Sequence, residues 1–174
     1  MSKKILIVGG GLAGTIIANG LCRHIGPQLR KGDVSITMLG TTDTHMYQPG
    51  LLYVPFGKIR EAELFRPQRK VLDKRVNFHV DPAANIDVEN KKVTCESGAV
   101  HTYDYMVLAT GSRIMPQNIP GMEEGAHWLY DLDGARKMRV ALDEFEGGKI
   151  VVNVNAPHKC PVAPLEITFM LKEY

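Results

Sequence analysis

The sequence contains few cysteines and no long apolar run. Its 174 residues include only Cys22, Cys95 and Cys160, an odd number at wide separations, which excludes a disulfide scaffold and a CxxC metal site. No stretch approaches the roughly 20 apolar residues of a membrane-spanning helix, and Met1–Lys4 lead straight into an apolar segment without a cleavable leader. We therefore expect a chain made in a reducing compartment, either cytoplasmic or resting on a membrane without crossing it.

An excess of charge of one sign is also missing. The 21 Lys and Arg residues nearly balance the 19 Asp and Glu residues, for a net charge of +2. This balance argues against nucleic acid as a partner, and we expect Arg66, Arg69 and Lys70 to form a solvated face. The length exceeds that of one small domain and falls short of two complete nucleotide-binding domains.

A glycine cluster follows the first apolar segment. Lys4–Val8 is rich in β-branched residues and ends at the spacing Gly9-x-Gly11-x-x-Gly14. Strand, tight turn and helix in this order bring backbone N–H groups against a pyrophosphate at a helix N-terminus. The sequence therefore predicts a Rossmann-like α/β domain with a dinucleotide cradle at these glycines.

The helix after the glycines is predicted to run to Ile25 and to close at Gly26-Pro27. Ile16, Ile17, Leu21 and Ile25 fit one buried face. Cys22 on the same helix is expected to be a small core residue.

Val34–Leu39 supplies the second strand of the βαβ unit. The acid that commonly grips the ribose at the end of this strand is missing, because Gly40 and Thr41 occupy the position. Ribose recognition would use threonine hydroxyls, backbone groups or a shifted Asp43. A turn or helix cap is the other interpretation of Asp43.

Residues 44–75 form an insertion that opens with Tyr47-Gln48-Pro49-Gly50-Leu51-Leu52. Pro49 and Gly50 indicate a sharp bend. The apolar residues after it could pack on a planar ring system, or they could belong to an ordinary turn followed by a core segment.

Short strands separated by turns follow. Four strands are predicted to form an antiparallel meander: 77–80, 85–88, 92–96 and 99–103. Val80 ends the first of them and is a candidate backbone contact for an adenine. An apolar strand at 105–109 then runs into Thr110 and Gly111, where small residues leave room for a ligand.

The C-terminal segment lacks glycine altogether after Gly148. A surface helix at 131–145 and a buried strand at 149–155 are predicted to open a second βαβ unit. Without a glycine fingerprint after that strand, NAD(P)H binding is disfavoured there.

Cys160 occupies the place of the missing glycines. A helix at 164–171 is predicted to follow it, and a helix N-terminus stabilises a thiolate, with His158 and Lys159 adding positive charge. Cys160 is therefore the candidate nucleophile. The other interpretation is a cysteine that fills a tight turn.

These motifs resemble a known group. The Gly9–Gly14 turn, the meander, and the run from Asp104 through Ala109-Thr110-Gly111 to Ile119-Pro120-Gly121 are similar to the FAD-binding half of the pyridine nucleotide-disulfide oxidoreductase superfamily. Within it, Tyr47-x-Pro49 and Lys159-Cys160-Pro161 resemble sulfide:quinone oxidoreductases and the flavoprotein of flavocytochrome c sulfide dehydrogenases.

The resemblance implies FAD as cofactor, held without a covalent bond unless Cys160 itself captures it, and no metal. The implied cofactor contacts are Gly9, Gly11, Leu12, Ala13, Gly14, Gly40, Thr41, Pro49, Val80, Thr110 and Gly111. It also implies an FAD-binding domain at 1–121 and, at 122–174, the start of a second, incomplete α/β domain carrying Cys160.

The implied reaction passes electrons from sulfide through Cys160 and FAD to a quinone. In the resembling enzymes a second cysteine and the quinone pocket lie far downstream, so we expect this chain alone to be incomplete, and a homo-oligomer with peripheral membrane contact is expected. Two alternatives remain open: an NADH:quinone reductase, and a non-catalytic flavin- or nucleotide-binding module.

Overall fold

The computed structural model describes residues 2–154 and 160–174. The chain forms two compact units: Met1–Met46 with Phe65–Arg113, and Tyr47–Leu64 with Ile114–Tyr174. These units divide the chain at other points than Gly121, because residues 47–64 associate with the C-terminal part. The expected domain boundary at Gly121 stays a prediction.

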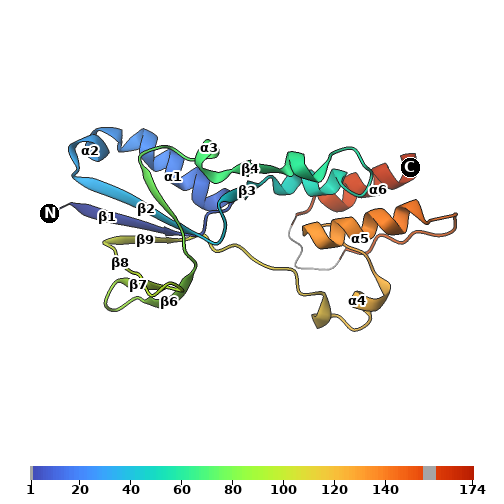
Figure 1. Ribbon diagram of the computed structural model, residues 1–174. Coiled ribbons are helices and arrows are strands. Elements are labelled where there is room, and N and C mark those ends of the chain that lie inside the picture. Colours follow the sequence, from blue (N-terminus) through green and yellow to red (C-terminus); the bar gives the residue numbers. More distant parts are fainter. Residues whose placement is uncertain (1, 155–159) are drawn as a thin grey trace. The chain divides into compact units, whose positions relative to one another are not determined.

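A four-stranded parallel sheet forms the centre of the first unit (Figure 1). Its order is β5-β2-β1-β9, and every neighbouring pair runs parallel. The strands are β1 (Lys3–Val8), β2 (Val34–Gly40), β5 (Val76–Val80) and β9 (Tyr105–Leu108). The predicted Rossmann-like α/β class is confirmed.

The prediction that the strand at 77–80 belongs to the meander is wrong, because these residues lie in β5 of the parallel sheet. β5 lies beside β2, with Ile36 opposite Val76 and Gly40 opposite Val80. The meander consists of the three later strands alone, β6 (Ala83–Asp87), β7 (Lys92–Cys95) and β8 (Val100–Thr102).

Two helices follow β1. They are α1 (Leu12–His24) and α2 (Gly26–Lys31). The predicted end of the first helix is confirmed, but Gly26 opens a new helix instead of a loop. Pro27 occupies its first turn, where a missing backbone N–H costs nothing.

The predicted buried face of α1 is confirmed at Leu21 and Ile25, which are partly buried against the core that contains Cys22, and is wrong at Ile16 and Ile17. Its buried positions carry small side chains, whereas Ile16 and Ile17 are exposed to 58% and 37%. Small residues let the helix lie close to β1, and this requirement outweighs hydrophobicity. The buried residues of α1 are Gly14, Thr15, Ala18 and Cys22.

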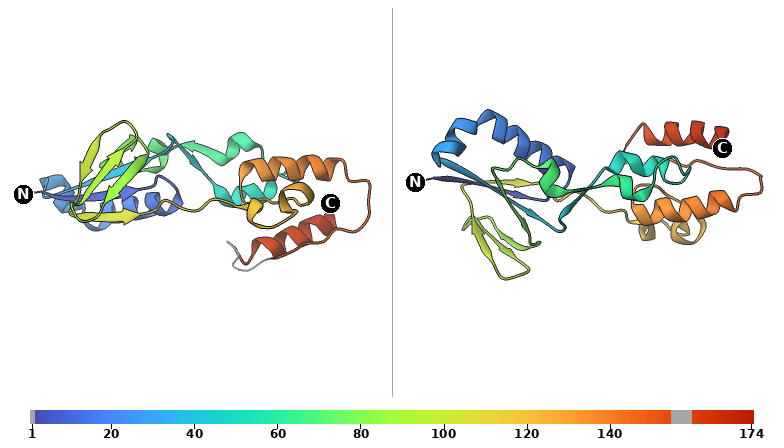
Figure 2. Two further views of the ribbon diagram at one scale, coloured as in Figure 1. Left: turned by 90° about the horizontal axis from the view of Figure 1, so that it is seen from below. Right: turned by 45° about the horizontal axis from the view of Figure 1, so that its top comes forward.

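Successive residues of the strands face opposite sides of the sheet, so the sheet has two cores. The helices cover one side and the meander the other (Figure 2). Ile7 packs on the helix side, and its neighbours Leu6 and Val8 pack on the meander side. Cys22 and Cys95 are buried in these two cores, as expected for structural thiols.

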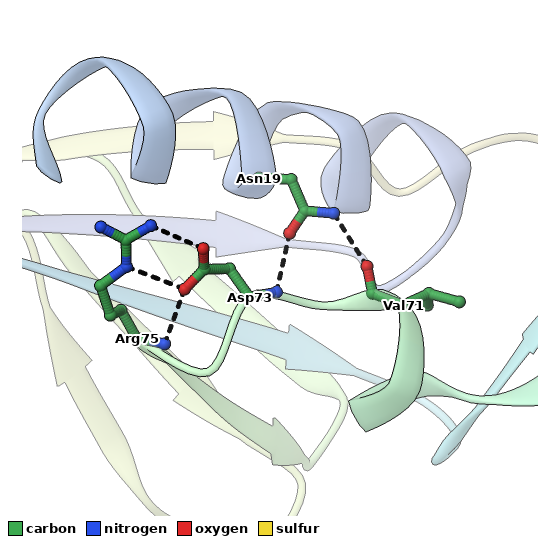
Figure 3. A network of polar contacts seen from close by, with 4 residues as sticks. All are labelled: Asn19, Val71, Asp73 and Arg75. Carbon is green, nitrogen blue, oxygen red and sulfur yellow. Dashed lines mark hydrogen bonds and ion pairs between the residues drawn. The ribbon is translucent and has the colours of Figure 1, made fainter.

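A small ribbon and a short helix complete the first unit. β3 (Thr44–Met46) pairs antiparallel with β4 (Phe65–Pro67), and α3 (Gln68–Val71) follows directly. The Asn19 side chain of α1 then fixes the chain after α3 (Figure 3). It donates to the carbonyl oxygen of Val71 and accepts from the backbone N–H of Asp73, each at 2.8 Å.

The second unit contains helices only among its described elements. The 3₁₀ helices are η1 (Gln48–Tyr53), η2 (Glu61–Leu64) and η3 (Pro116–Asn118); the α-helices are α4 (Met122–Gly125), α5 (Leu132–Asp143) and α6 (Ala163–Glu173). The predicted helices at 131–145 and 164–171 are confirmed by α5 and α6. Their core contains Leu52, Leu129, Met138, Leu142 and Ile167.

The predicted buried strand at 149–155 is wrong over its described residues. Residues 149–154 are not strand, and Val151 is 76% exposed. A strand needs a neighbour for its backbone hydrogen bonds, and no strand of the described residues pairs with this segment.

Among the residues that the structure describes, no helix combines the length and apolar character needed to cross a bilayer.

Candidate nucleotide-binding site

Most of the predicted cofactor contacts gather at one edge of the parallel sheet. Because all four strands run in the same direction, the turns that follow them lie at their common carboxyl edge. Open α/β sheets bind ligands at this edge. The residues that the structure brings there are Gly9, Gly11, Leu12, Ala13, Gly14, Gly40, Thr41, Val80, Thr110 and Gly111.

Gly9 and Gly14 are required by the protein itself. Gly9 has φ +120°, and a Cβ at this position would collide with the carbonyl oxygen of Ala109. A Cβ at Gly14 would collide with the carbonyl oxygen of Gly9. The backbone N–H of Gly9 donates to the carbonyl of Leu39 at 2.8 Å. The turn is therefore held between the end of β2 and the residue that follows β9.

Gly11 is different, because the fold leaves space for a side chain there. Apart from its chain neighbours, no described atom lies within 4 Å of a Cβ built at Gly11, and its backbone is extended (φ −74°, ψ −164°). It caps α1, whose first turn carries no acid and begins with the exposed Leu12 and Ala13. This open helix N-terminus, with unpaired N–H groups, fits a phosphate.

Gly40 and Val80 lie side by side at the end of β2 and β5. Gly40 is buried, and a Cβ there would approach the ring of Phe78 to 2.8 Å. Thr41 and Val80 are exposed. Asp43 lies in a bend before β3 and starts no helix, so of its non-ligand interpretations the turn is the one observed.

The turn after β9 is open as well. Gly111 has φ +73°, which favours glycine, and no described atom lies within 4 Å of a Cβ built there. Thr110 is exposed beside it. Small residues thus follow the neighbouring strands β1 and β9.

Arg69 is exposed, as the expectation of a solvated face requires, but it also binds the neighbouring strand β5. Its guanidinium donates to the carbonyls of Val76 (3.1 Å) and Phe78 (2.7 Å) and lies 5.4 Å from the centre of the Phe78 ring. It thereby covers the outer edge of β5.

Sequence reasoning also missed the buried Thr15 and Gln68, because their contacts join positions 53 residues apart.

Pro49 lies in the second unit, exposed in η1. Leu51 and Leu52 after it are buried, with 2% and 5% exposure. Of the two interpretations of this bend, a turn followed by a core segment is the one that the structure describes.

Cys160, also in the second unit, is partly exposed and precedes α6. The Tyr130 hydroxyl donates to the carbonyl oxygen of Cys160 at 3.3 Å. Burial, and then the neighbouring Cys160, raise the pKa of Tyr130. His158 and Lys159 lie outside the described residues.

The other two thiols are less suited to chemistry. Burial, followed by the nearby Asp73, raises the pKa of Cys22, and burial, followed by Asp81, raises the pKa of Cys95. Within the described ranges, no cluster of His, Cys, Asp and Glu could hold a metal ion.

Comparison with protein families identifies the fold's relatives. The model of the pyridine nucleotide-disulphide oxidoreductases matches residues 3–153. The chain belongs to this family. Mouse mitochondrial sulfide:quinone oxidoreductase is 25% identical over 98% of this chain, and the external alternative NAD(P)H-ubiquinone oxidoreductase B2 of Arabidopsis thaliana is 28% identical over 83% of it. The chain spans 38% and 26% of the length of these two relatives.

A solved structure shows the same fold. The sulfide:quinone oxidoreductase of Aquifex aeolicus superposes with a TM-score of 0.69 and 24% identity, covering 82% of this chain and 32% of that one. The family is one of FAD-binding flavoproteins, and FAD is the cofactor of this fold. The open N-terminus of α1 and the bare backbone at Gly11 fit the pyrophosphate of such a dinucleotide.

Proposed function

We propose that this chain is the FAD-binding part of a flavoprotein that oxidises sulfide and passes the electrons to a quinone. The observation that carries the proposal is the extent of the match with mouse sulfide:quinone oxidoreductase. Because it covers 98% of the chain, it includes the segment around Cys160. The partial exposure of Cys160 ahead of α6 is consistent with a reactive role.

In this proposal the sheet edge binds and orients the cofactor. The backbone at Gly9, Gly11 and Gly14 holds the pyrophosphate, helped by the N–H groups of Leu12 and Ala13 at the start of α1. Gly40 and Thr41 contact the ribose, and Val80 the adenine. Thr110 and Gly111 lie along the flavin side, and Pro49 is a further proposed contact.

FAD supplies a two-electron acceptor that can pass its electrons on to a quinone. Overall, H₂S loses two electrons and two protons to give sulfur at oxidation state zero, and the quinone gains them to give a quinol. Sulfide attacks the Cys160 sulfur only if that sulfur is oxidised in a disulfide, whose other sulfur leaves as a thiolate. Cys22 and Cys95 are buried, so the proposal requires a further accessible cysteine as partner.

An NADH:quinone oxidoreductase is the second candidate. The 28% identity to the plant NAD(P)H-ubiquinone oxidoreductase favours it. Against it, the chain has no glycine after Gly148, and residues 149–154 do not form the strand that would lead into a second dinucleotide cradle.

Anaerobic absorption spectra of the FAD-loaded chain test the proposal. Because the chain holds no accessible partner for Cys160, this thiol is first converted to a mixed disulfide with glutathione, whose thiolate leaves when sulfide attacks. Sulfide should then bleach the flavin band faster than it bleaches free FAD, and NADH should not. Cys160→Ser and Cys160→Ala should bind FAD as the parent does and lose the sulfide response. Equal bleaching in these variants, a rate no faster than that of free FAD, or bleaching by NADH instead would contradict sulfide oxidation through Cys160.

A further inference from the structure

Gln68 and Thr15 are the two buried polar residues among the described part of the chain. Gln68 is 1% exposed and Thr15 is 6% exposed. Neither has a role in the site described above. A buried amide is costly unless its donors and acceptor are satisfied, so the partners of Gln68 are informative.

These partners form a chain that leads to the glycine turn. The Thr15 hydroxyl donates to the carbonyl oxygen of Gly10 at 3.4 Å, and Gln68 Nε2 donates to Thr15 Oγ1 at 2.8 Å. Gln68 Oε1 lies 3.2 Å from His45 Nδ1. Four elements are joined in this way: β3, α3, α1 and the turn after β1.

The donor and the acceptor of each of these hydrogen bonds can be assigned by starting from the Gly10 carbonyl oxygen. The Gly10 carbonyl can only accept, so the Thr15 hydroxyl is the donor, and Thr15 Oγ1 then accepts from the amide nitrogen of Gln68. The amide oxygen of Gln68 therefore faces His45 Nδ1, which must carry the hydrogen. Neutral histidine in water prefers the hydrogen on Nε2, so the network selects the less common tautomer for His45.

The main chain keeps Gln68 in place independently of its side chain. Its backbone N–H donates to the carbonyl of Asp43 at 2.6 Å, and its carbonyl accepts from Leu72 at 3.1 Å. The side chain is thus anchored behind the glycine turn.

This series of hydrogen bonds also sets the orientation of the Gly11 N–H, because a trans peptide is planar. The C=O of Gly10 and the N–H of Gly11 belong to one planar peptide unit and point in opposite directions. Fixing the Gly10 carbonyl toward Thr15 therefore aims the Gly11 N–H away from Thr15. A Cβ at Gly11 would meet no described atom within 4 Å apart from its chain neighbours, and we assign this position to the pyrophosphate.

We propose that Gln68 is a positioning residue for the nucleotide: through Thr15 it orients the Gly10–Gly11 peptide so that the Gly11 N–H donates to the pyrophosphate. The proposal rests on FAD binding at the glycine turn, which is part of the proposed function, but not on sulfide as substrate. Gln68 acts through the turn and does not touch the cofactor.

Two measurements test this role. The first is the Kd for FAD, from flavin fluorescence, of Gln68→Met, which keeps the side-chain length without hydrogen bonds, and of Thr15→Val. Both substitutions should raise the Kd about tenfold. This factor corresponds to about 1.4 kcal/mol of binding free energy, which is about the contribution of one charge-assisted hydrogen bond. Thr15→Ser keeps the hydroxyl and should retain the parent's affinity. Lys70→Met, an exposed neighbour on α3, is the matched control and should change nothing.

The second measurement needs no cofactor. The ¹⁵N shifts of the His45 ring, recorded at a pH where it is neutral, should show hydrogen on Nδ1 in the parent chain and in Lys70→Met. In Gln68→Met the ring should move toward the Nε2–H tautomer, and a variant that is merely destabilised would not show this change.

The outcomes separate this proposal from the proposed function. Hydrogen on Nε2 of His45 in the parent, or an unchanged Kd in folded Gln68→Met and Thr15→Val, overturns the positioning role. If Gln68→Met does not fold, the proposal is still tested by the His45 tautomer of the parent and by the Kd values of Thr15→Val and Thr15→Ser. A chain that binds no FAD overturns both proposals, whereas one that binds FAD and ignores sulfide overturns only the function.

Discussion

The backbone of Gly9 lies directly against the carbonyl oxygen of Ala109. This contact joins the turn after β1 to the end of β9, two segments separated by most of the first unit. It explains why the first glycine of the cluster serves the protein's own packing, while Gly11 two residues later faces open space.

Gly9→Ala should therefore unfold the first unit much more easily. A Cβ at position 9 adds a collision with Ala109 to the strain of φ +120°, and we expect a loss of about 3 kcal/mol in the free energy of unfolding, measured with urea. Gly32→Ala is the matched control, because Gly32 has φ +75° but no described atom within 4 Å of an added Cβ. It should cost about 1 kcal/mol. Equal losses in the two variants would show that the collision is unimportant.

The ion pair in Figure 3 predicts a dependence of stability on pH. The side chain and backbone N–H of Arg75 hydrogen-bond the Asp73 carboxylate and lower its pKa from 3.8 to about 2. A carboxyl whose pKa is lower in the folded state stabilises the fold above its unfolded pKa, and this stabilisation is lost as pH falls through the folded value. The window is therefore about pH 4 down to about pH 2.

Asp73→Asn should remove this contribution. At neutral pH it should lower the free energy of unfolding by about 1–2 kcal/mol, allowing for the partial exposure of the pair. The difference from the parent should shrink as urea unfolding is repeated from pH 4 toward pH 2. A difference that stays constant over this range would mean that the pair does not carry the effect.

The three thiols should react at different rates with iodoacetamide. Cys160 is partly exposed, whereas Cys22 and Cys95 are buried and have raised pKa values, and the reactive species is the thiolate. Mass spectrometry of the native chain should find the label on Cys160 first, with the other two modified only after unfolding. Labelling of Cys22 or Cys95 at the rate of Cys160 would contradict the two-core arrangement of the first unit.

Local patterns predicted the parts of the fold that depend on neighbouring residues. The apolar run 4–8 and the glycines after it specify strand, turn and helix by themselves. The exposure of Ile16 and Ile17 on α1 could not be predicted in this way, because both are more hydrophobic than the small residues that the close approach to β1 requires. The run at 149–155 contains four apolar residues, as β1 does, but its described residues have no pairing strand in the described part of the chain.

The candidate site shows the same division. The glycines and Thr110 could be found from sequence because steric demands of backbone and ligand select small residues there. Gln68 and Arg69 could not, because their roles arise only when α3 is placed against α1 and β5. No local pattern marks a glutamine that will be buried.

Binding of FAD by the parent chain and by Gly11→Ala tests the central claim most directly. Apart from its chain neighbours, no described atom lies within 4 Å of the added methyl group, so the free energy of unfolding of Gly11→Ala should equal that of the parent within about 1 kcal/mol. If the pyrophosphate approaches the backbone here, its Kd for FAD, followed by flavin fluorescence, should rise at least about tenfold. Equal affinity in the two proteins, or no binding by the parent, would contradict a cofactor site at this edge of the sheet.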